Sequence, residues 1–253
     1  MSNFLEHIGS EQQVIPPGSQ TLSLTVSSPP IILDHASLGG VDLIHPRRSS
    51  VYRKGGKRAF DLALVLLAAP FLVVIVLLIA ALVSADGAAP FYRHWRVGKD
   101  GKLFGCVKLR TMTTDANERL TAILASNAEA ADEWAKTQKL RHDPRVTFLG
   151  LFLRKTSLDE LPQFWNVIRG EMSFVGPRPV TLEELDRYGI LRGAYLSVRP
   201  GITGPWQIHP MRNDMSYGAR VVLDASYASS VNLRSDLKVI IETARWALHP
   251  NGC

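Results

Sequence analysis

One uninterrupted apolar segment constrains the fold of this chain more than any other feature. Residues 62–83 form a run of 22 positions without a charged side chain, nearly all of them Leu, Val, Ile, Ala or Phe. As one straight helix this run would be about 33 Å long, against a bilayer hydrocarbon core of roughly 30 Å. A buried helix of a soluble protein is the alternative, but such helices are usually shorter. The segment therefore predicts a membrane-embedded protein.

Pro70 leaves two membrane arrangements open. Its ring removes one backbone donor and clashes with the carbonyl of Leu66, four residues earlier. The result is either a kinked helix that crosses the bilayer, or a re-entrant helix–break–helix hairpin that returns to the same face. Basic residues after the segment and the globular sequence beyond residue 90 favour the return. The short halves of such a hairpin and its freed backbone groups count against it, so the residues alone leave both arrangements open.

A basic stretch precedes the apolar segment. Residues 46–58 carry six positive charges and no negative ones. By the positive-inside rule this side of the segment lies in the cytoplasm, and each charge attracts anionic membrane lipid by about 1 kcal/mol. We therefore expect a basic juxtamembrane segment over 46–58 and a membrane hairpin over 59–85.

The rest of the chain divides into a tail and a catalytic domain. Residues 1–45 are rich in Pro, Ser and Thr without a sustained period, which predicts a disordered tail. Residues 86–253 predict a mostly helical α+β domain, with amphipathic helices that lie along the membrane interface. Within it we expect two strands around a turn over 91–112, and helices over 115–140, 181–189 and 232–248. Over 147–168 we expect a short strand or helix followed by a helix. The net charge of +6 is modest and no nucleic-acid-binding motif occurs, so nucleic acid is not an expected partner.

Asp159 and Glu160 are the first candidates for chemistry. Ser157 and Glu160 fit a helix capping box, and Asp159 as the cap would place Pro162 in the first helical turn. In either frame two carboxylates lie at the positive end of a helix, which favours their ionised forms. An ionised Asp there can attack phosphorus, bind a metal such as Mg²⁺, or simply cap the helix. The residues alone leave these roles open.

Several basic side chains could bind phosphate. Arg178 stands between two prolines and Arg199 precedes Pro200, so the backbone fixes where each guanidinium starts. A planar, permanently charged guanidinium suits a phosphate group. The other candidates are Lys108 and Arg110, two apart on an expected strand, and Arg154. Surface salt bridges are the alternative for each of them.

The order of these motifs resembles the bacterial sugar transferase family, the monotopic phosphoglycosyl transferases that begin exopolysaccharide and O-antigen assembly. The most specific match is Arg154-Lys-Thr-Ser-Leu-Asp-Glu-Leu-Pro-Gln163. Further matches, including Lys57, Arg58 and Asp61 before the apolar segment, lie at 57–61, 101–112, 143–147, 165–167, 170–173, 175–179, 199–204 and 206–207. The chain looks most like the short members that initiate exopolysaccharides.

The resemblance implies a reaction. Such enzymes move a sugar-1-phosphate from a UDP-sugar to undecaprenyl phosphate and release UMP, with UDP-galactose or UDP-glucose as the expected donor here. The family nucleophile corresponds to Asp159, and Glu160 is the neighbouring carboxylate that helps with Mg²⁺ or with proton handling. Phosphate binding falls to a set of five basic residues: Lys108, Arg110, Arg154, Arg178 and Arg199.

The resemblance also implies a location. It selects the re-entrant hairpin with its break near Pro70, at the cytoplasmic face of the bacterial inner membrane. Other polysaccharide-synthesis enzymes and a second copy of the chain are further candidate partners. The alternative function is a catalytically silent membrane scaffold, against which the intact Asp159–Glu160 pair argues. Where relatives carry a Ser-Gly-Arg loop this chain has Ile208 to Arg212, so the identity of the sugar stays open.

Overall fold

The computed structural model describes residues 51–137, 140–212 and 214–248. The predicted tail over 1–45 lies outside these residues. The α-helices are α2 (Lys57–Val83), α3 (Ala116–Ser126), α4 (Ala128–Thr137), α5 (Phe148–Thr156), α6 (Phe164–Arg169), α7 (Leu182–Asp186), α8 (Arg192–Leu196), α9 (Tyr217–Ser230) and α10 (Leu233–Leu248). The strands are β1 (Phe91–Val97), β2 (Leu103–Leu109), β3 (Ser173–Val175) and β4 (Gly201–Thr203). The expected α+β, mostly helical class is confirmed.

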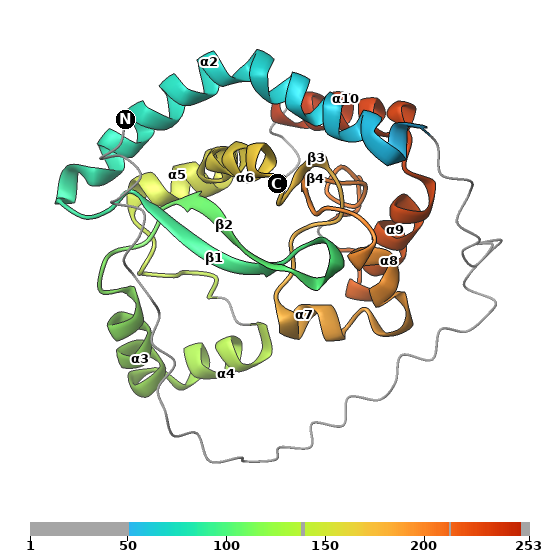
Figure 1. Cartoon of the computed structure of the whole chain (residues 1–253). Helices are drawn as coiled ribbons and strands as arrows, with labels where there is room; N and C mark the ends of the chain where they lie inside the picture. Colours follow the sequence, from blue (N-terminus) through green and yellow to red (C-terminus); the bar gives the residue numbers. More distant parts are fainter. Residues whose placement is uncertain (1–50, 138–139, 213, 249–253) are drawn as a thin grey trace. The chain divides into compact units, whose positions relative to one another are not determined.

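The apolar segment forms the single long helix α2, which follows a π-helical turn at Tyr52–Gly56. The helix does not break at Pro70: it continues as one helix of 27 residues, and Figure 1 shows it curving over its neighbours. Among the described residues it is the one helix long and apolar enough to cross a membrane, and its most apolar 18-residue window has a mean hydropathy of 3.3. Only 11% of its most apolar window is buried, which is unlike the core helix of a soluble protein.

The N-terminal end of α2 is tied to the domain by polar contacts. Lys57 Nζ lies 2.6 Å from a carboxylate oxygen of Asp236 on α10. Arg58 donates to the carbonyl oxygens of Val167 and Ile168 at the end of α6. The sequence assigned these basic residues to the membrane segment. The structure also gives them contacts within the domain.

The next turn of α2 enters the core. Asp61 is 2% exposed and accepts hydrogen bonds from Ser173 Oγ at 2.9 Å and from the backbone N–H of Phe174 at 3.1 Å. One turn later Val65 is fully buried against Phe104 and its neighbours. The helix therefore contributes residues to the interior of the domain as well as an apolar outer face.

The C-terminal end of α2 is tied to the same domain. Arg110, just beyond β2, donates to both carboxylate oxygens of Asp86, at 2.6 and 2.7 Å, and to the carbonyl of Val83 at 2.8 Å. Positive charge at a helix C-terminus is favourable because the last carbonyls lack backbone partners. Both ends of the apolar helix are thus fixed to one domain.

The strands form two small sheets. β1 and β2 pair in antiparallel register, from Phe91 opposite Leu109 to Val97 opposite Leu103, which confirms the predicted pair of strands. β3 and β4 pair in parallel. An antiparallel bridge between Val97 and Val180 joins the end of the β1–β2 hairpin to the segment before α7. This bridge places the Arg178 segment beside the hairpin.

The predicted helix over 115–140 is two helices. The chain leaves helical geometry at Asn127, whose side-chain oxygen accepts the backbone N–H of Ala130 and so caps α4. Asn favours such caps because its short side chain bonds the first free N–H groups of a helix. The predicted helices near 181–189 and 232–248 are confirmed as α7 and α10, and Thr181 with Glu184 forms the capping box of α7.

Candidate active site

Asp159 and Glu160 lie on a 3₁₀ helix, η5 (Leu158–Gln163), between α5 and α6. The predicted capping box at Ser157 is wrong. Ser157 has a left-handed backbone, with φ of 57°, which ends α5, and its side chain caps nothing. The Glu160 side chain extends instead to β2, where its Oε1 lies 2.6 Å from Lys108 Nζ. The turn therefore presents both carboxylates to the β1–β2 hairpin.

Asp159 is a buried carboxylate with nearby positive charges. Its residue is 7% exposed, and burial raises its pKa above the usual range, with a further increase from Glu160. Lys108 and Arg154 oppose this shift because they stabilise the ionised form. Within the described residues, its carboxylate has no hydrogen bond to another residue. Asp159 can thus be ionised and still have free oxygen lone pairs, as a nucleophile requires.

Lys108 is paired with Glu160 and lies near enough to Asp159 for their charges to interact. Burial alone would lower its pKa, but the charge and hydrogen bond of Glu160 raise it above its usual value. Lys108 therefore keeps its positive charge at neutral pH. It stabilises an ionised Asp159, and it can also attract a phosphate.

Arg154 reaches the site because α5 packs directly on the chain after β2. At Gly150 a Cβ atom would lie 2.0 Å from the carbonyl oxygen of Thr111, so only glycine allows this approach. One turn later the Nε of Arg154 donates to Thr111 Oγ1 at 2.8 Å. This bond uses one edge of the guanidinium. The described structure shows no protein partner for its two terminal nitrogens.

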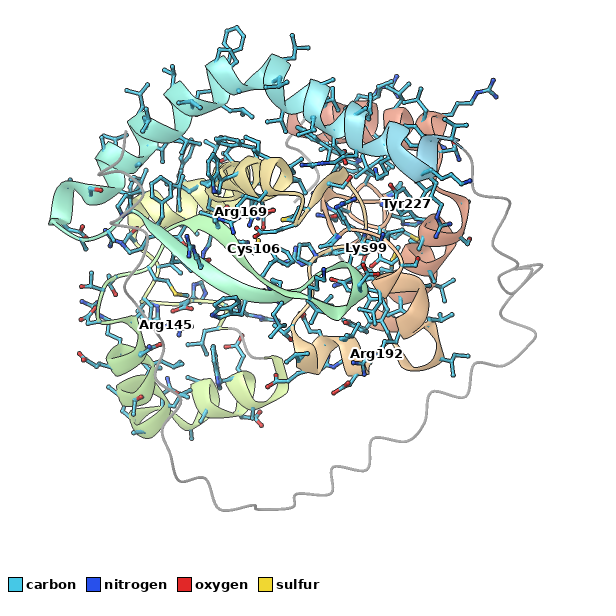
Figure 2. All side chains as sticks on the ribbon, viewed as in Figure 1. Lys99, Cys106, Arg145, Arg169, Arg192 and Tyr227 are labelled. Atoms are coloured by element: carbon cyan, nitrogen blue, oxygen red, sulfur yellow. The ribbon has the colours of Figure 1, made fainter. Side chains whose placement is uncertain are left out.

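The opposite strand adds residues that the sequence reasoning missed. Tyr92, His94 and Arg96 alternate along β1, so they share one face. Tyr92 pairs with Lys108 in the register, and His94 pairs with Cys106, which Figure 2 labels on the hairpin. Partial burial and the charge of Asp159 raise the pKa of Tyr92, against the effect of Lys108. The alternation of these three residues in the sequence could have placed them on one face of a strand. Their pairing with Lys108 and Cys106 depends on the register of the hairpin, which is set by the exact position of the turn.

The other predicted phosphate-binding residues divide into two groups. Arg178 is exposed, and its positive charge acts on His94 and Cys106, which places it near the hairpin face. Arg110 is instead bonded to the end of α2, as described above. The Nε of Arg199 donates to the carbonyl of Gly170 at 2.7 Å, beyond α6. The structure therefore brings together Lys108, Arg154, Asp159 and Glu160, with Arg178 nearby, and gives Arg110 and Arg199 contacts elsewhere.

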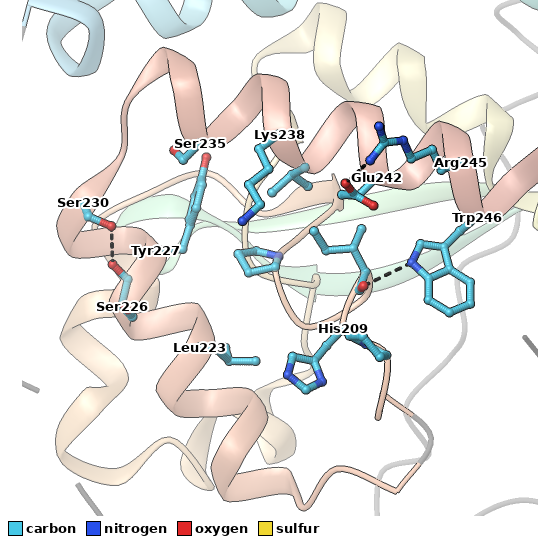
Figure 3. A pocket seen from close by; sticks show the side chains of 14 residues that line it. His209, Leu223, Ser226, Tyr227, Ser230, Ser235, Lys238, Glu242, Arg245 and Trp246 are labelled. Atoms are coloured by element: carbon cyan, nitrogen blue, oxygen red, sulfur yellow. Dashed lines mark hydrogen bonds and ion pairs between the residues drawn. The ribbon is translucent and has the colours of Figure 1, made fainter. Parts of the chain in front are cut away.

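A separate hollow of about 860 Å³ lies between α9, α10 and the loop at 205–210. Figure 3 shows Lys238 and Trp246 of α10 along one side of it and Leu223 of α9 on the other. The indole N–H of Trp246 donates to the carbonyl of Ile208, which fixes the loop against α10. None of the predicted site residues lines this hollow. It is therefore a separate feature from the carboxylate pair.

The donor set around Asp159 fits a magnesium ion only together with a substrate. Among the described residues no group of three or more His, Cys, Asp or Glu side chains could hold a metal. Mg²⁺ is usually bound by one or two carboxylates and by substrate phosphates, which needs no larger protein cluster. Asp159 and Glu160 supply that number.

Comparison with known proteins identifies one family. The model of the bacterial sugar transferase family matches residues 52–250. Exopolysaccharide production protein ExoY of Sinorhizobium fredii is 47% identical over 188 residues, which are 74% of this chain and 83% of that protein. UDP-galactose-lipid carrier transferase of Erwinia amylovora is 45% identical over 200 residues, or 78% of this chain. Undecaprenyl-phosphate galactose phosphotransferase of Salmonella typhimurium is 42% identical over the same share. The match spans 41% of each of these last two proteins.

Proposed function

Because this chain belongs to the bacterial sugar transferase family, we propose that it transfers a sugar-1-phosphate from a UDP-hexose to undecaprenyl phosphate. UDP-galactose and UDP-glucose are the donors to test first, because one relative is named for UDP-galactose and another for UDP-glucose. The observation that carries the proposal is the pair Asp159 and Lys108. A buried carboxylate without a hydrogen-bonding partner among the described residues lies near a cation that opposes the rise of its pKa.

The first half of the reaction uses Asp159 as the nucleophile. Its carboxylate oxygen attacks the phosphorus that carries the sugar, and an O–P bond forms. The bond from that phosphorus to the bridging oxygen breaks, and UMP leaves with the electron pair. A covalent aspartyl phosphosugar remains on the enzyme. Nucleophilic catalysis of this kind divides one difficult transfer between two bulky substrates into two simpler steps.

The second half returns the enzyme to its starting state. A phosphate oxygen of undecaprenyl phosphate attacks the same phosphorus, and the bond to Asp159 breaks. The product is a sugar linked to undecaprenyl through a diphosphate. Because both steps are attacks on the same phosphorus and place negative charge on the same oxygens, one set of cations can stabilise both transition states.

The described contacts indicate a separate role for each cation in stabilising the phosphate charge. Lys108 lies against Glu160 and stabilises the ionised Asp159, so it is already in place when the substrate binds. Arg154 is oriented by Thr111 through Nε, which leaves its two terminal nitrogens for a phosphate group. Arg178 approaches from the segment before α7. Fixed cations of this kind stabilise charge on transferring phosphoryl oxygens without reorganisation during the reaction.

We propose that Mg²⁺ binds together with the substrate diphosphate, with Glu160 and Asp159 as its protein ligands. Such an ion neutralises phosphate charge that would otherwise repel the carboxylate. Lys108 contacts only Oε1 of Glu160, so Oε2 of the same carboxylate would remain for the ion.

The membrane placement follows from the two ends of α2. Both ends contact one domain, so a straight crossing would separate contacts that the structure holds together. We therefore propose a monotopic protein in which α2, which curves without a break at Pro70 (Figure 1), enters the cytoplasmic leaflet and brings both of its ends to the same face. Three further helices also carry exposed apolar side chains: Phe148, Leu151 and Phe152 of α5, Trp165 and Ile168 of α6, and Leu233, Leu237 and Ile241 of α10. Aromatic and aliphatic residues of this kind are typical of membrane interfaces.

The deciding experiment measures UMP release from the purified full chain. The reaction contains Mg²⁺, undecaprenyl phosphate and one UDP-sugar at a time. Release with one sugar that depends on the lipid, and formation of a radiolabelled lipid from labelled sugar, would support the proposal and identify the donor. The absence of release with every sugar, from protein that unfolds cooperatively, would contradict it and favour a scaffold role.

A further inference from the structure

We infer that His94 is a neutral hydrogen-bond donor to the diphosphate of the bound UDP-sugar, and that Arg96 fixes the imidazole in the tautomer that can donate. The inference rests on the proposed function, because it names a recognition residue for that substrate. It concerns the β1 face, where the sequence suggested no candidate.

The hydrogen bond between Arg96 and His94 defines the tautomer. Arg96 Nη2 lies 3.3 Å from Nδ1 of His94. A guanidinium can only donate hydrogen bonds, so the imidazole Nδ1 must accept. The single proton of a neutral imidazole then lies on Nε2, and that N–H is free to donate to a ligand.

Arg96 is itself held in place. Its Nη1 donates to Glu184 Oε2 at 3.0 Å, and the same carboxylate oxygen accepts the backbone N–H of Thr181 at 2.9 Å in the capping box of α7. Behind this pair, Tyr195 donates to the carbonyl of Val97 at 2.7 Å and closes the end of β1. The guanidinium therefore cannot turn away from His94 without losing its ion pair with Glu184.

The charges around His94 oppose its protonation. The groups that face it are Arg96 on its own strand, Lys108 on β2, Arg178 before α7, and the one carboxylate of Glu184. Partial burial and the three cations lower its pKa to about 4, and only Glu184 opposes them. A second proton would also have to displace the hydrogen bond from Arg96. The imidazole is therefore neutral across the physiological range.

The location of His94 selects the diphosphate as its partner. The nearby cations Lys108 and Arg178 attract an anion to this face. A neutral N–H donor adds a directed hydrogen bond to a phosphate oxygen, and its protonation state does not change during the transfer. This residue would then contribute to the binding of the UDP-sugar more than to the attack by Asp159.

The test compares substitutions at His94 with a matched control on the full chain. His94→Ala should lower kcat/KM for the UDP-sugar by about 10- to 100-fold, mainly through KM, as expected for the loss of a hydrogen bond to a charged group. His94→Gln should recover part of this loss, because its amide can donate from a similar position. The exposed His142 provides the control, and His142→Ala should leave kcat/KM unchanged.

Arg96→Gln tests the fixed tautomer. Without the guanidinium, the imidazole should titrate closer to its ordinary pKa of about 6.5. The pH profile of kcat/KM should then gain a step in that region that the unmodified chain lacks. Nitrogen NMR of histidine-labelled protein in detergent provides a readout independent of activity. Nδ1 of His94 should be unprotonated from pH 5.5 to 8 in the unmodified chain, and the tautomers should mix in Arg96→Gln.

Two results would overturn the inference. One is full kcat/KM in His94→Ala, from a chain that transfers sugar phosphate normally; the proposed function would then stand without this residue. The other is a protonated Nδ1 in the unmodified chain. If the unmodified chain transfers no sugar phosphate, the proposed function fails separately. The tautomer measurement and the weakening of UDP binding in His94→Ala would still decide the role of His94.

Discussion

Two acidic clusters of this protein contain the same residue types but differ in how their carboxylates are hydrogen-bonded. Beneath α2, Lys57 lies 2.6 Å from Asp236, and Asp61 is a second buried carboxylate in the cluster. Beside the β1–β2 hairpin, Lys108 lies 2.6 Å from Glu160, with Asp159 as the second carboxylate. Each cluster thus combines one lysine with two acids.

The clusters differ in how completely the acids are bonded. Asp236 also accepts hydrogen bonds from Tyr52 at 2.6 Å and Tyr227 at 2.8 Å, and Asp61 accepts from Ser173 and the backbone of Phe174. Asp159 accepts nothing from any other described residue. A fully bonded carboxylate stabilises the fold, whereas one that is buried without partners can react. The comparison therefore separates a cluster whose acids are hydrogen-bonded from the cluster that we propose carries the chemistry.

The largest effect on activity should come from Asp159→Asn. Loss of the nucleophile should reduce UMP release by about 10³-fold or more, because other parts of the site cannot form the covalent bond. The same variant should remain folded, and its unfolding free energy at neutral pH should rise. The folded chain raises the pKa of Asp159, so ionisation above the ordinary Asp range costs stability that Asn does not. UMP release within tenfold of the unmodified chain would remove Asp159 from the nucleophile role.

The largest effect on stability should come from Asp236→Ala. The change leaves Lys57 buried without its partner and removes the acceptor of two tyrosine hydroxyls. Breaking a buried ion pair costs about 3–5 kcal/mol of unfolding free energy. Denaturant unfolding in detergent measures the loss, with the exposed Glu118→Ala as the control. Unchanged stability would show that the two clusters are not distinguished by their bonding.

The pH dependence of transfer should distinguish the Asp159 cluster further. Because the pKa of Asp159 is raised, kcat/KM should fall on acidification at a pH above the ordinary Asp value of about 3.9. Lys108 lowers this pKa, so Lys108→Gln should move the acid limb to higher pH as well as reduce the rate. A limb that stays in place after this substitution would mean that Lys108 does not set the ionisation of Asp159.

The smallest effect is expected at Pro70, because other contacts hold both ends of α2. A cysteine introduced at exposed Ala89 reports the side of the membrane, in a chain that carries Cys253→Ser. Cys106 should stay silent, since burial raises the pKa of its thiol to about 11. Pro70→Ala alone should leave the reporter accessible from the cytoplasmic side.

The double variant Pro70→Ala with Arg110→Ala tests what holds the helix. Removal of Arg110 breaks its hydrogen bonds to Val83 and Asp86 at the C-terminal end of α2. Periplasmic labelling in the double variant alone would assign the return to this contact. Periplasmic labelling after Pro70→Ala alone would assign it to the proline.

The sequence predicted features that depend on neighbouring residues. The apolar helix, the β1–β2 hairpin, α7 and α10 all follow from local period or turn chemistry. The capping box at Ser157 failed because Glu160 has a stronger partner in Lys108, 52 residues away in the chain. Arg110 was likewise predicted to bind phosphate, but it pairs with Asp86, which lies 24 residues away in the chain. Motif matching located Asp159, but its lack of bonding partners could be seen only in three dimensions.

The buried contacts of α2 make the apolar helix and the candidate active site one folding unit. Val65 of α2 packs against Phe104 and Cys106 of β2, the strand that carries Lys108. A truncated chain without α2 would expose this interior and leave Asp236 without Lys57. Replacement by a generic anchor of equal length would fail for the same reason. Solubilising the enzyme by deleting its anchor is therefore not an available engineering route, and detergents or nanodiscs must preserve the helix together with the fold.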